Sequence, residues 1–281
     1  MLEWESLFIV QHPVDSYMKA PILNTILGLA LLSLAACSTF AGGEIENVSL
    51  PTDTPVPATP TIIWFPASVT PTAPALPTIA ATPDQKPGVG NILLSDDFSS
   101  AAIWNPALSD EGGVDVSQKQ LTIAVQPGIT AIRLRQDTPF NNFYAEITAR
   151  LGLCRGADDY GLLFRAPKAI AYYSFALSCN GTARVERISV GTPHILQDAI
   201  LSGDVPRGAP GEVRLGIWAN GSEFRFFLND RYQFSVNDKN YPAGAIGVFA
   251  RAAGSTPVTV SFSDLIVRSV DYQPPIQTRV P

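Results

Sequence analysis

Several residue types are scarce in this chain of 281 residues, and each scarcity excludes a kind of chemistry. The chain has three cysteines, two histidines and two methionines, and only 16% of its residues are charged. Its 19 Lys and Arg residues are scattered among 25 Asp and Glu residues, and the net charge is −6. Because no basic stripe is present to attract phosphate groups, nucleic acid is excluded as a partner.

The sequence also has little of what hydrolytic or metal catalysis requires. Hydrolysis of a glycoside commonly needs two carboxylates that face the sugar. The glutamates on or beside predicted strands each stand alone: Glu146, Glu186, Glu212 and Glu223. A Ser-His-Asp triad or a histidine metal centre would rest on His194 alone, which we expect in a surface loop. We therefore predict no catalytic residue, no metal ligand and no cofactor.

An apolar run near the N-terminus has the layout of a signal peptide. Lys19 precedes the run, which spans residues 22–36 and ends in Leu34-Ala-Ala-Cys37. The run is shorter than the ~20 residues that a membrane-spanning helix needs. Small residues before a cysteine resemble the lipobox of bacterial lipoproteins, in which the thiol receives a diacylglycerol. The resemblance implies cleavage before Cys37 and lipidation of Cys37.

Residues 1–36 are therefore predicted to be a signal peptide, and the lipid on Cys37 to be a membrane anchor. We expect the chain at a bacterial cell membrane or cell surface, with its domain outside the cytoplasm. Residues 1–17 contain Glu3, Glu5 and Asp15, where a signal peptide usually has a basic start. Met18 is the better start, and residues 1–17 then belong to a mis-called start; a genuine longer start is the alternative.

Residues 37–90 form a predicted linker rich in proline and threonine. Prolines recur every few residues from Pro51 onward. Proline cannot donate a backbone hydrogen bond, and such segments favour extended, disordered conformations. Some 40 residues of this kind reach on the order of 120 Å. The linker is therefore predicted to be a stalk between the lipid anchor and a globular domain.

After residue 90 the sequence changes to short apolar runs, with hardly any helical periodicity. Runs rich in Val, Ile, Phe and Tyr predict strands at 92–98, 120–125, 131–135, 143–151, 160–166, 171–179, 183–188, 212–219, 222–228, 232–236, 245–250 and 258–267. So many strands predict an all-β fold, a two-layer antiparallel β-sandwich or jelly roll over residues 91–270, with a C-terminal tail at 271–281. Asn180-Gly181 and Asn220-Gly221 are predicted to form type I′ hairpin turns.

Motifs within this region resemble the concanavalin A-like lectin/glucanase superfamily. They include Tyr160-Gly-Leu-Leu-Phe-Arg165, Gly216-Ile-Trp-Ala-Asn-Gly-Ser222, Ala243-Gly-Ala-Ile-Gly-Val-Phe249 and Val260-Ser-Phe-Ser-Asp-Leu-Ile266. The laminin-G-like and 3-keto-disaccharide hydrolase (DUF1080-type) branches are the nearest in pattern. The resemblance implies a concanavalin A-like sandwich. It does not select a function, because the superfamily holds lectins, glycosidases and structural modules.

The sequence departs from the hydrolases of this superfamily. The Glu-x-Asp-x-x-Glu string of laminarinase-like members is absent, and Asp159-Tyr-Gly-Leu-Leu-Phe164 replaces the strand associated with the DUF1080-type branch. We therefore lean against an enzyme and predict a non-catalytic module that binds carbohydrate or another extracellular ligand. The alternatives are a glycoside hydrolase of the 3-keto-disaccharide type and a structural or protein-interaction module.

A ligand-binding face is predicted from strand alternation. Arg165, Tyr172, Arg214 and Trp218 each point outward from their strands, and if they share one face they offer an aromatic platform with hydrogen-bonding groups. Such a platform suits a sugar. The alternative is that Trp218 and Tyr172 merely cover the sheet or meet a loop.

Two further predictions concern the cysteines and calcium. Export removes the chain from the reducing cytoplasm, and after lipidation of Cys37 only Cys154 and Cys179 remain, so we predict a disulfide between them. Two buried free thiols are the alternative. Calcium is a weak candidate ligand for the loop oxygens of Asp158-Asp159 and Asn237-Asp238, because such oxygens are common in loops.

Overall fold

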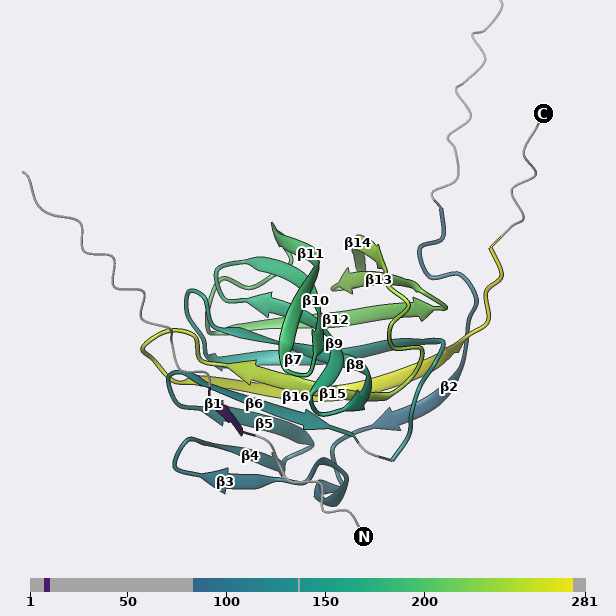
Figure 1. Ribbon diagram of the computed structural model, residues 1–281. Coiled ribbons are helices and arrows are strands. Elements are labelled where there is room, and N and C mark those ends of the chain that lie inside the picture. Colours follow the sequence, from purple (N-terminus) through teal and green to yellow (C-terminus); the bar gives the residue numbers. More distant parts are fainter. Residues whose placement is uncertain (1–7, 11–82, 136, 275–281) are drawn as a thin grey trace, which may run out of the picture. The chain divides into compact units, whose positions relative to one another are not determined.

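The computed structural model describes residues 8–10, 83–135 and 137–274 (Figure 1). Cys37, the lipobox and the Pro/Thr-rich linker up to residue 82 lie outside the described residues. Within the described residues, no helix has the length and apolar character needed to cross a membrane.

The described chain folds as two antiparallel sheets and one short 3-10 helix, η1 (Ala101–Trp104). Sheet A has the spatial order β1 (Phe8–Val10), β6 (Ile129–Leu134), β15 (Ala245–Arg251), β8 (Asp159–Lys168), β9 (Ala171–Ser178), β10 (Thr182–Ser189), β11 (Thr192–Leu201). Sheet B has the order β14 (Arg231–Asn237), β13 (Glu223–Leu228), β12 (Gly211–Asn220), β7 (Phe143–Leu153), β16 (Val258–Val270), β5 (Gln120–Val125), β4 (Gly112–Ser117), β3 (Ala107–Ser109), and β2 (Val89–Asp96) also pairs with β16. The predicted all-β, two-layer antiparallel sandwich is confirmed.

The hydrophobic core lies between the two sheets because the strands alternate apolar and polar residues. On β13, Phe224, Phe226 and Leu228 are in the core, whereas Arg225 faces outward. Aromatic rings from both sheets meet there, and the ring centroids of Tyr173 and Phe224 are 4.9 Å apart. Burial of the apolar side chains therefore sets which residues of each strand face the core.

Four strands were missed by the sequence prediction: β1, β3, β4 and β11. Strand β11 lies at the edge of sheet A and is mostly exposed, so its sequence lacks a clear apolar alternation. The expectation of a loop around His194 is wrong, because His194 is on β11, paired opposite Arg187. It is exposed, as expected of a surface residue.

The two predicted Asn-Gly hairpins are present, but their predicted type I′ geometry is wrong. Only the glycines have positive φ, 91° at Gly181 and 55° at Gly221. The Asn180 side chain accepts a hydrogen bond from the Thr182 N–H at 3.1 Å, and Asn220 still pairs within the strand ladder. Pairs of positive φ, the mark of type I′ turns, occur instead at hairpins 118–119, 190–191 and 229–230.

Candidate functional site

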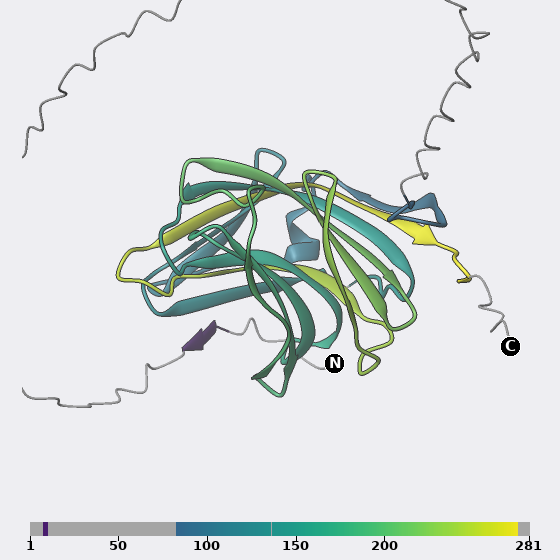
Figure 2. The ribbon, with the colours of Figure 1, turned by 90° about the horizontal axis from the view of Figure 1, so that it is seen from above.

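The outer face of sheet A is hollowed into a groove of about 280 Å³, which we call the sheet A groove. Its lining comes from β6, β15, β8, β9, β10 and β11, and from the turns after β8 and β10. Figures 1 and 2 show that the β10–β11 hairpin curls away from the rest of the sheet. Arg184, Glu186 and Ile188 of β10 and Pro193 of β11 are among the lining residues.

Strand register brings the groove residues side by side. Alternation turns every second residue outward, and antiparallel pairing then places these residues in rows across the strands. Three such rows are Arg251, Asp159 and Ser178; Phe249, Gly161, Ala176 and Arg184; and Leu163, Ser174 and Glu186. A Cβ atom at Gly161 would lie 3.1 Å from a ring carbon of Phe249 and 2.0 Å from the Phe175 carbonyl oxygen, so only glycine leaves room here.

One end of the groove carries a compact set of four charged side chains. Asp159 is 1% exposed, and its two carboxylate oxygens accept hydrogen bonds from Arg184 at 2.9 and 3.0 Å. Arg251 contacts the same carboxylate, and Arg184 Nε also donates to Glu186 at 3.1 Å. Burial lowers the pKa of Arg184, but hydrogen bonds and charges from Asp159 and Glu186 outweigh that effect and hold the pKa above its ordinary value.

The floor of the groove is apolar. Ile132, Leu163, Ala176, Tyr172 and Phe249 pack together outside sheet A, in a cluster separate from the main core. Burial, and to a smaller extent the charge of Glu186, raises the pKa of the Tyr172 hydroxyl to about 12. Tyr172 therefore stays protonated at neutral pH and is able to donate a hydrogen bond.

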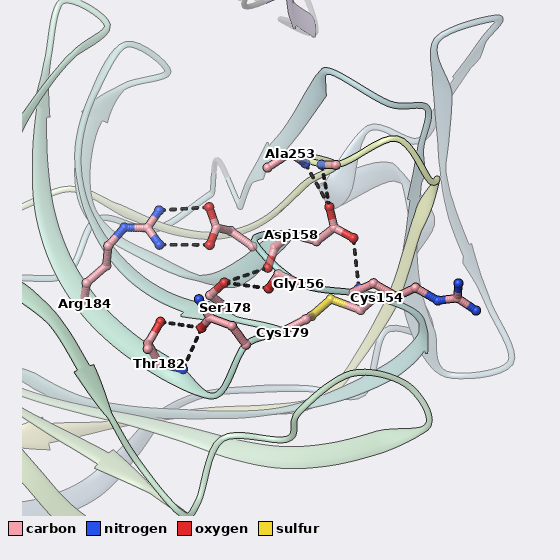
Figure 3. The surroundings of a disulfide bond; sticks show 12 residues. Cys154, Gly156, Asp158, Ser178, Cys179, Thr182, Arg184 and Ala253 are labelled. Carbon is pink, nitrogen blue, oxygen red and sulfur yellow. Dashed lines mark hydrogen bonds and ion pairs between the residues drawn. A yellow bond between two sulfur atoms is a disulfide. The ribbon is translucent and has the colours of Figure 1, made fainter. Parts of the chain in front are cut away.

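A disulfide corner supports the charged end (Figure 3). Cys154 and Cys179 are bonded, with Cα atoms 5.9 Å apart, so the predicted disulfide is confirmed. Beside the bond, the buried carboxylate of Asp158 accepts hydrogen bonds from the backbone N–H groups of Arg155, Ala253 and Gly254 at 2.9 to 3.0 Å. The next residue, Asp159, faces the groove. The corner therefore fixes the start of β8 and, with it, the position of Asp159.

The side chains proposed for calcium are held by donors of the protein itself. Asp158 and Asp159 have the partners described above, and Asp238 accepts hydrogen bonds from the Tyr173 hydroxyl at 2.6 Å and the Asn240 N–H at 2.8 Å. In the part of the chain that the structure describes, no three His, Cys, Asp or Glu side chains are grouped so as to hold a metal ion.

The four residues predicted to share a ligand-binding face do not share one. Tyr172 lies on the groove floor. Arg165 is fully buried, and its guanidinium donates to the carbonyl oxygens of Asn141 and Gly221 at 2.7 and 2.6 Å; burial lowers its pKa to about 10. Arg214 and Trp218 lie on β12 in sheet B. Alternation sets which side of its own sheet a residue faces, but not which sheet the strand joins.

Trp218 is covered by residues just before β2 and just after β16. Its indole N–H donates to the Pro87 carbonyl at 2.9 Å, and the guanidinium of Arg225 lies 4.5 Å above its ring. The Tyr272 ring meets it edge-on. Trp218 is 0% exposed. It therefore covers the outer face of sheet B, as the alternative interpretation of this residue held. We call the covering segment before β2, residues 85–88, the strap.

Sequence reasoning missed most of the groove residues. Arg184 and Glu186 alternate with core residues on β10, and Phe249 and Arg251 do so on β15. The sequence shows this alternation of core and outward residues, but the same alternation occurs in the strands of sheet B, so it does not distinguish the two outer faces. There, three isolated glutamates pair with arginines: Glu146 with Arg214, Glu212 with Arg150 and Glu223 with Arg225.

The fold and the groove define a class of protein: a two-layer antiparallel β-sandwich with a grooved outer face on one sheet. No protein-family model matches this chain, and no curated protein matches it.

Similar solved structures include the carbohydrate-binding module CBM66 from Bacillus subtilis, at 16% identity and a TM-score of 0.46, over 66% of this chain and 98% of that one. A Bacillus subtilis protein of unknown function with a galectin-like fold has 12% identity and a TM-score of 0.48, over 66% and 99% of the chains. The catalytic domain of an endo-1,3-beta-glucanase (laminarinase) from Thermotoga petrophila has 12% identity and a TM-score of 0.48, over 65% and 98%. Likenesses at this level carry no argument about activity or ligand.

Proposed function

We propose that the sandwich binds a carbohydrate in the sheet A groove without cleaving it, as part of a lipoprotein that holds the domain outside the cytoplasm. The observation that carries the binding proposal is the lining of the groove. An aromatic and apolar floor, with Phe249 and Tyr172, is bordered by the hydrogen-bonding side chains of Ser174, Arg184 and Glu186. A sugar presents apolar C–H faces and hydroxyl edges, and such a lining suits both.

The size of the groove bears on the length of the ligand. Its volume of about 280 Å³ lies just below the range of about 300–1,000 Å³ that is usual for ligand sites. A short saccharide, or the end of a longer one, therefore suits the groove better than a continuous polymer.

Glycoside hydrolysis is the alternative, and the arrangement of carboxylates disfavours it. Both common mechanisms use two carboxyl groups that flank the scissile bond. Among the described residues that line the groove, Glu186 is the one carboxylate. The nearby Asp159 is buried, and its carboxylate oxygens are already bonded to the guanidinium groups of Arg184 and Arg251.

A glycan array probed with the full chain, followed by calorimetric titration of the hits, tests the proposal. Phe249→Ala is expected to weaken binding at least tenfold, since it removes the aromatic floor. Leu108→Ala is the matched control, because Leu108 is 91% exposed on β3 of the other sheet. Absence of any glycan hit, or equal affinities for both variants, contradicts the proposal. Release of reducing sugar that is lost in Glu186→Gln would support the hydrolase instead.

A further inference from the structure

The lining of the sheet A groove changes character along its length. Arg251, Arg184 and Glu186 lie at one end, around Asp159. At the other end, Ile188 pairs opposite Tyr172 on one side and Pro193 on the other. The residues that line this second end carry no charge: Ile170, Tyr172, Ile188, Gly191 and Pro193.

The apolar end continues into an exposed lip, formed where two turns meet. The Gly191 N–H donates to the Ile170 carbonyl at 3.2 Å, which joins the turn after β10 to the turn after β8. Ile170 and Val190 are 38% and 76% exposed. Exposed apolar side chains at the end of a binding groove gain free energy when a ligand covers them. A bare sugar, with hydroxyls around its ring, would leave this lip in contact with water.

The four charged side chains at the charged end of the groove have no net charge. Two guanidinium groups, of Arg184 and Arg251, are matched by the two carboxylates of Asp159 and Glu186, and these groups bond to one another. An anionic ligand would have to compete with Asp159 and Glu186 for the guanidinium groups. A neutral ligand with hydroxyls avoids that competition and still receives hydrogen bonds from the remaining N–H groups.

We infer that the groove binds a neutral saccharide that carries an apolar substituent, an alkyl or acyl group. The sugar lies against Ser174, Arg184 and Glu186, and the substituent lies against Ile188 and the lip. This inference rests on the proposed function, because it names the class of ligand for the same groove.

Calorimetric titration of the full chain with matched glycosides tests the inference. The probes are octyl-β-D-glucoside, kept below its micelle concentration, and methyl-β-D-glucoside, together with the octyl and methyl glycosides of any sugar found on the array. The octyl member is expected to bind at least tenfold more tightly. That factor corresponds to about 1.4 kcal/mol, roughly the burial of two methylene groups. Raising the salt concentration to about 0.5 M should change either affinity less than twofold, because the ligand is neutral.

Two variants test where the alkyl chain of the octyl glycoside binds. Ile188→Ser, and Ile170→Ser as a second variant in an exposed turn, should bring the ratio of octyl to methyl glycoside affinity close to one, because each removes apolar contact for the alkyl chain. Leu108→Ser, on the opposite sheet, should keep the preference. If Ile188→Ser and Ile170→Ser keep the preference, or Leu108→Ser loses it, the alkyl chain binds elsewhere and the inference is overturned.

Failure of the inference is distinguishable from failure of the proposed function. If octyl and methyl glycosides bind equally and Phe249→Ala weakens both, the groove binds saccharide but not its substituent, and only the inference falls. If neither glycoside nor any array glycan binds, the proposed function falls and takes the inference with it.

Discussion

At the scale of single residues, the most consequential side chain is Asp159. It is almost fully buried, and it holds Arg184 and Arg251 in place at the end of the groove. The pair with Arg184 is bidentate, the geometry in which arginine and carboxylate interact most strongly. Removal of one partner of a buried ion pair is costly, because the remaining charge is left without its counter-ion.

We predict that Asp159→Ala lowers the free energy of unfolding by about 3 kcal/mol. Urea denaturation followed by circular dichroism measures the change. Asp97→Ala is the control, because Asp97 is exposed, pairs with the exposed Lys119 and accepts one exposed hydrogen bond, from the Ser99 N–H at 3.2 Å; its effect should stay within about 0.5 kcal/mol. Similar losses in both variants would show that the Asp159 cluster does not stabilise the fold.

Asp238 makes stability depend on pH. Burial raises the pKa of its carboxyl. Hydrogen bonds from Tyr173 and Asn240 and the charge of Arg187 lower this pKa by more than burial raises it, so the pKa lies below the ordinary value. A carboxyl whose folded pKa is depressed stabilises the fold above its unfolded pKa of about 3.9, and this contribution disappears as pH falls through the folded pKa.

The wild-type chain should therefore lose stability steadily as the pH is lowered from about 5. Asp238→Asn removes the titrating group, so its stability should fall less over the same range. Thermal unfolding at a series of pH values compares the two slopes. Parallel slopes would mean that Asp238 has the same pKa in the folded and unfolded chains.

At the scale of elements, the disulfide corner joins the loop before β8 to the end of β9. The bond closes a loop with a sequence separation of 25 residues. Cross-linking a loop of this size lowers the entropy of the unfolded chain, and the gain in stability is roughly 3 kcal/mol.

The double variant Cys154→Ala/Cys179→Ala should lose about that much stability in a denaturant titration. Because the corner positions Asp159, it should also bind the groove ligand more weakly. Thiol titration of the denatured, unreduced wild-type chain supplies the control, with no reactive Cys154 or Cys179 expected. A variant as stable as the wild type would show that the corner is held by hydrogen bonds, such as those of Asp158, rather than by the bond.

The strap is the second element with a testable role. Lys86 pairs with Asp230 and lies about 5 Å from the ring centres of Tyr144 and Phe227, while Pro87 accepts the Trp218 hydrogen bond. Together these contacts fasten the residues before β2 to the outer face of sheet B. The strap therefore attaches on the face of the sandwich that does not carry the groove.

Trp218→Ala should speed hydrogen exchange at Gly88 and at Asp271, whose N–H donates to the Gly88 carbonyl at 2.9 Å. Loss of a buried tryptophan side chain costs about 3–5 kcal/mol. Groove binding should be unchanged once the variant is folded, which mass spectrometry of exchange and calorimetry check together. Weaker ligand binding by a folded Trp218→Ala chain would indicate that Trp218 belongs to the ligand-binding site.

At the scale of the whole molecule, the proposed function combines an anchor with a groove. We propose that a lipid on Cys37 and the Pro/Thr-rich linker hold the domain at a membrane, where the groove binds its ligand. This arrangement depends on the lipobox, Leu34-Ala-Ala-Cys37.

Cys37→Ser should abolish lipidation and release the chain from the membrane fraction, because serine offers no thiol for the diacylglycerol. Metabolic labelling with a palmitate analogue, followed by membrane fractionation, measures both effects. The control is Ser38→Ala, which keeps the thiol. Label retained by Cys37→Ser, or a signal segment still present in the mature wild-type protein, would refute the anchor.

The sequence by itself determined what is local. Period-two alternation identified most strands and predicted correctly that Arg214 and Trp218 on β12 face away from the core, because burial of one face of a strand favours an apolar residue at every second position. The disulfide followed from the small number of cysteines, since Cys154 and Cys179 have no other partner in the chain if Cys37 is lipidated, as predicted. Strand β11, at the edge of sheet A, shows no such alternation, because most of its residues are exposed.

Only the tertiary structure decided which strands share a sheet. Tyr172, Arg214 and Trp218 obey the alternation, yet Tyr172 lies in the groove of sheet A and the other two lie on the outer face of sheet B. Arg165 departs from the alternation at an irregularity in β8, where its φ is 45°, and its side chain is buried. Strand pairing joins residues that are far apart in the chain, such as Arg251 and Asp159, and local periodicity carries no record of those partners. The groove exists only after β15, β8, β9 and β10 are side by side, so its residues become recognisable as a set only in the folded chain.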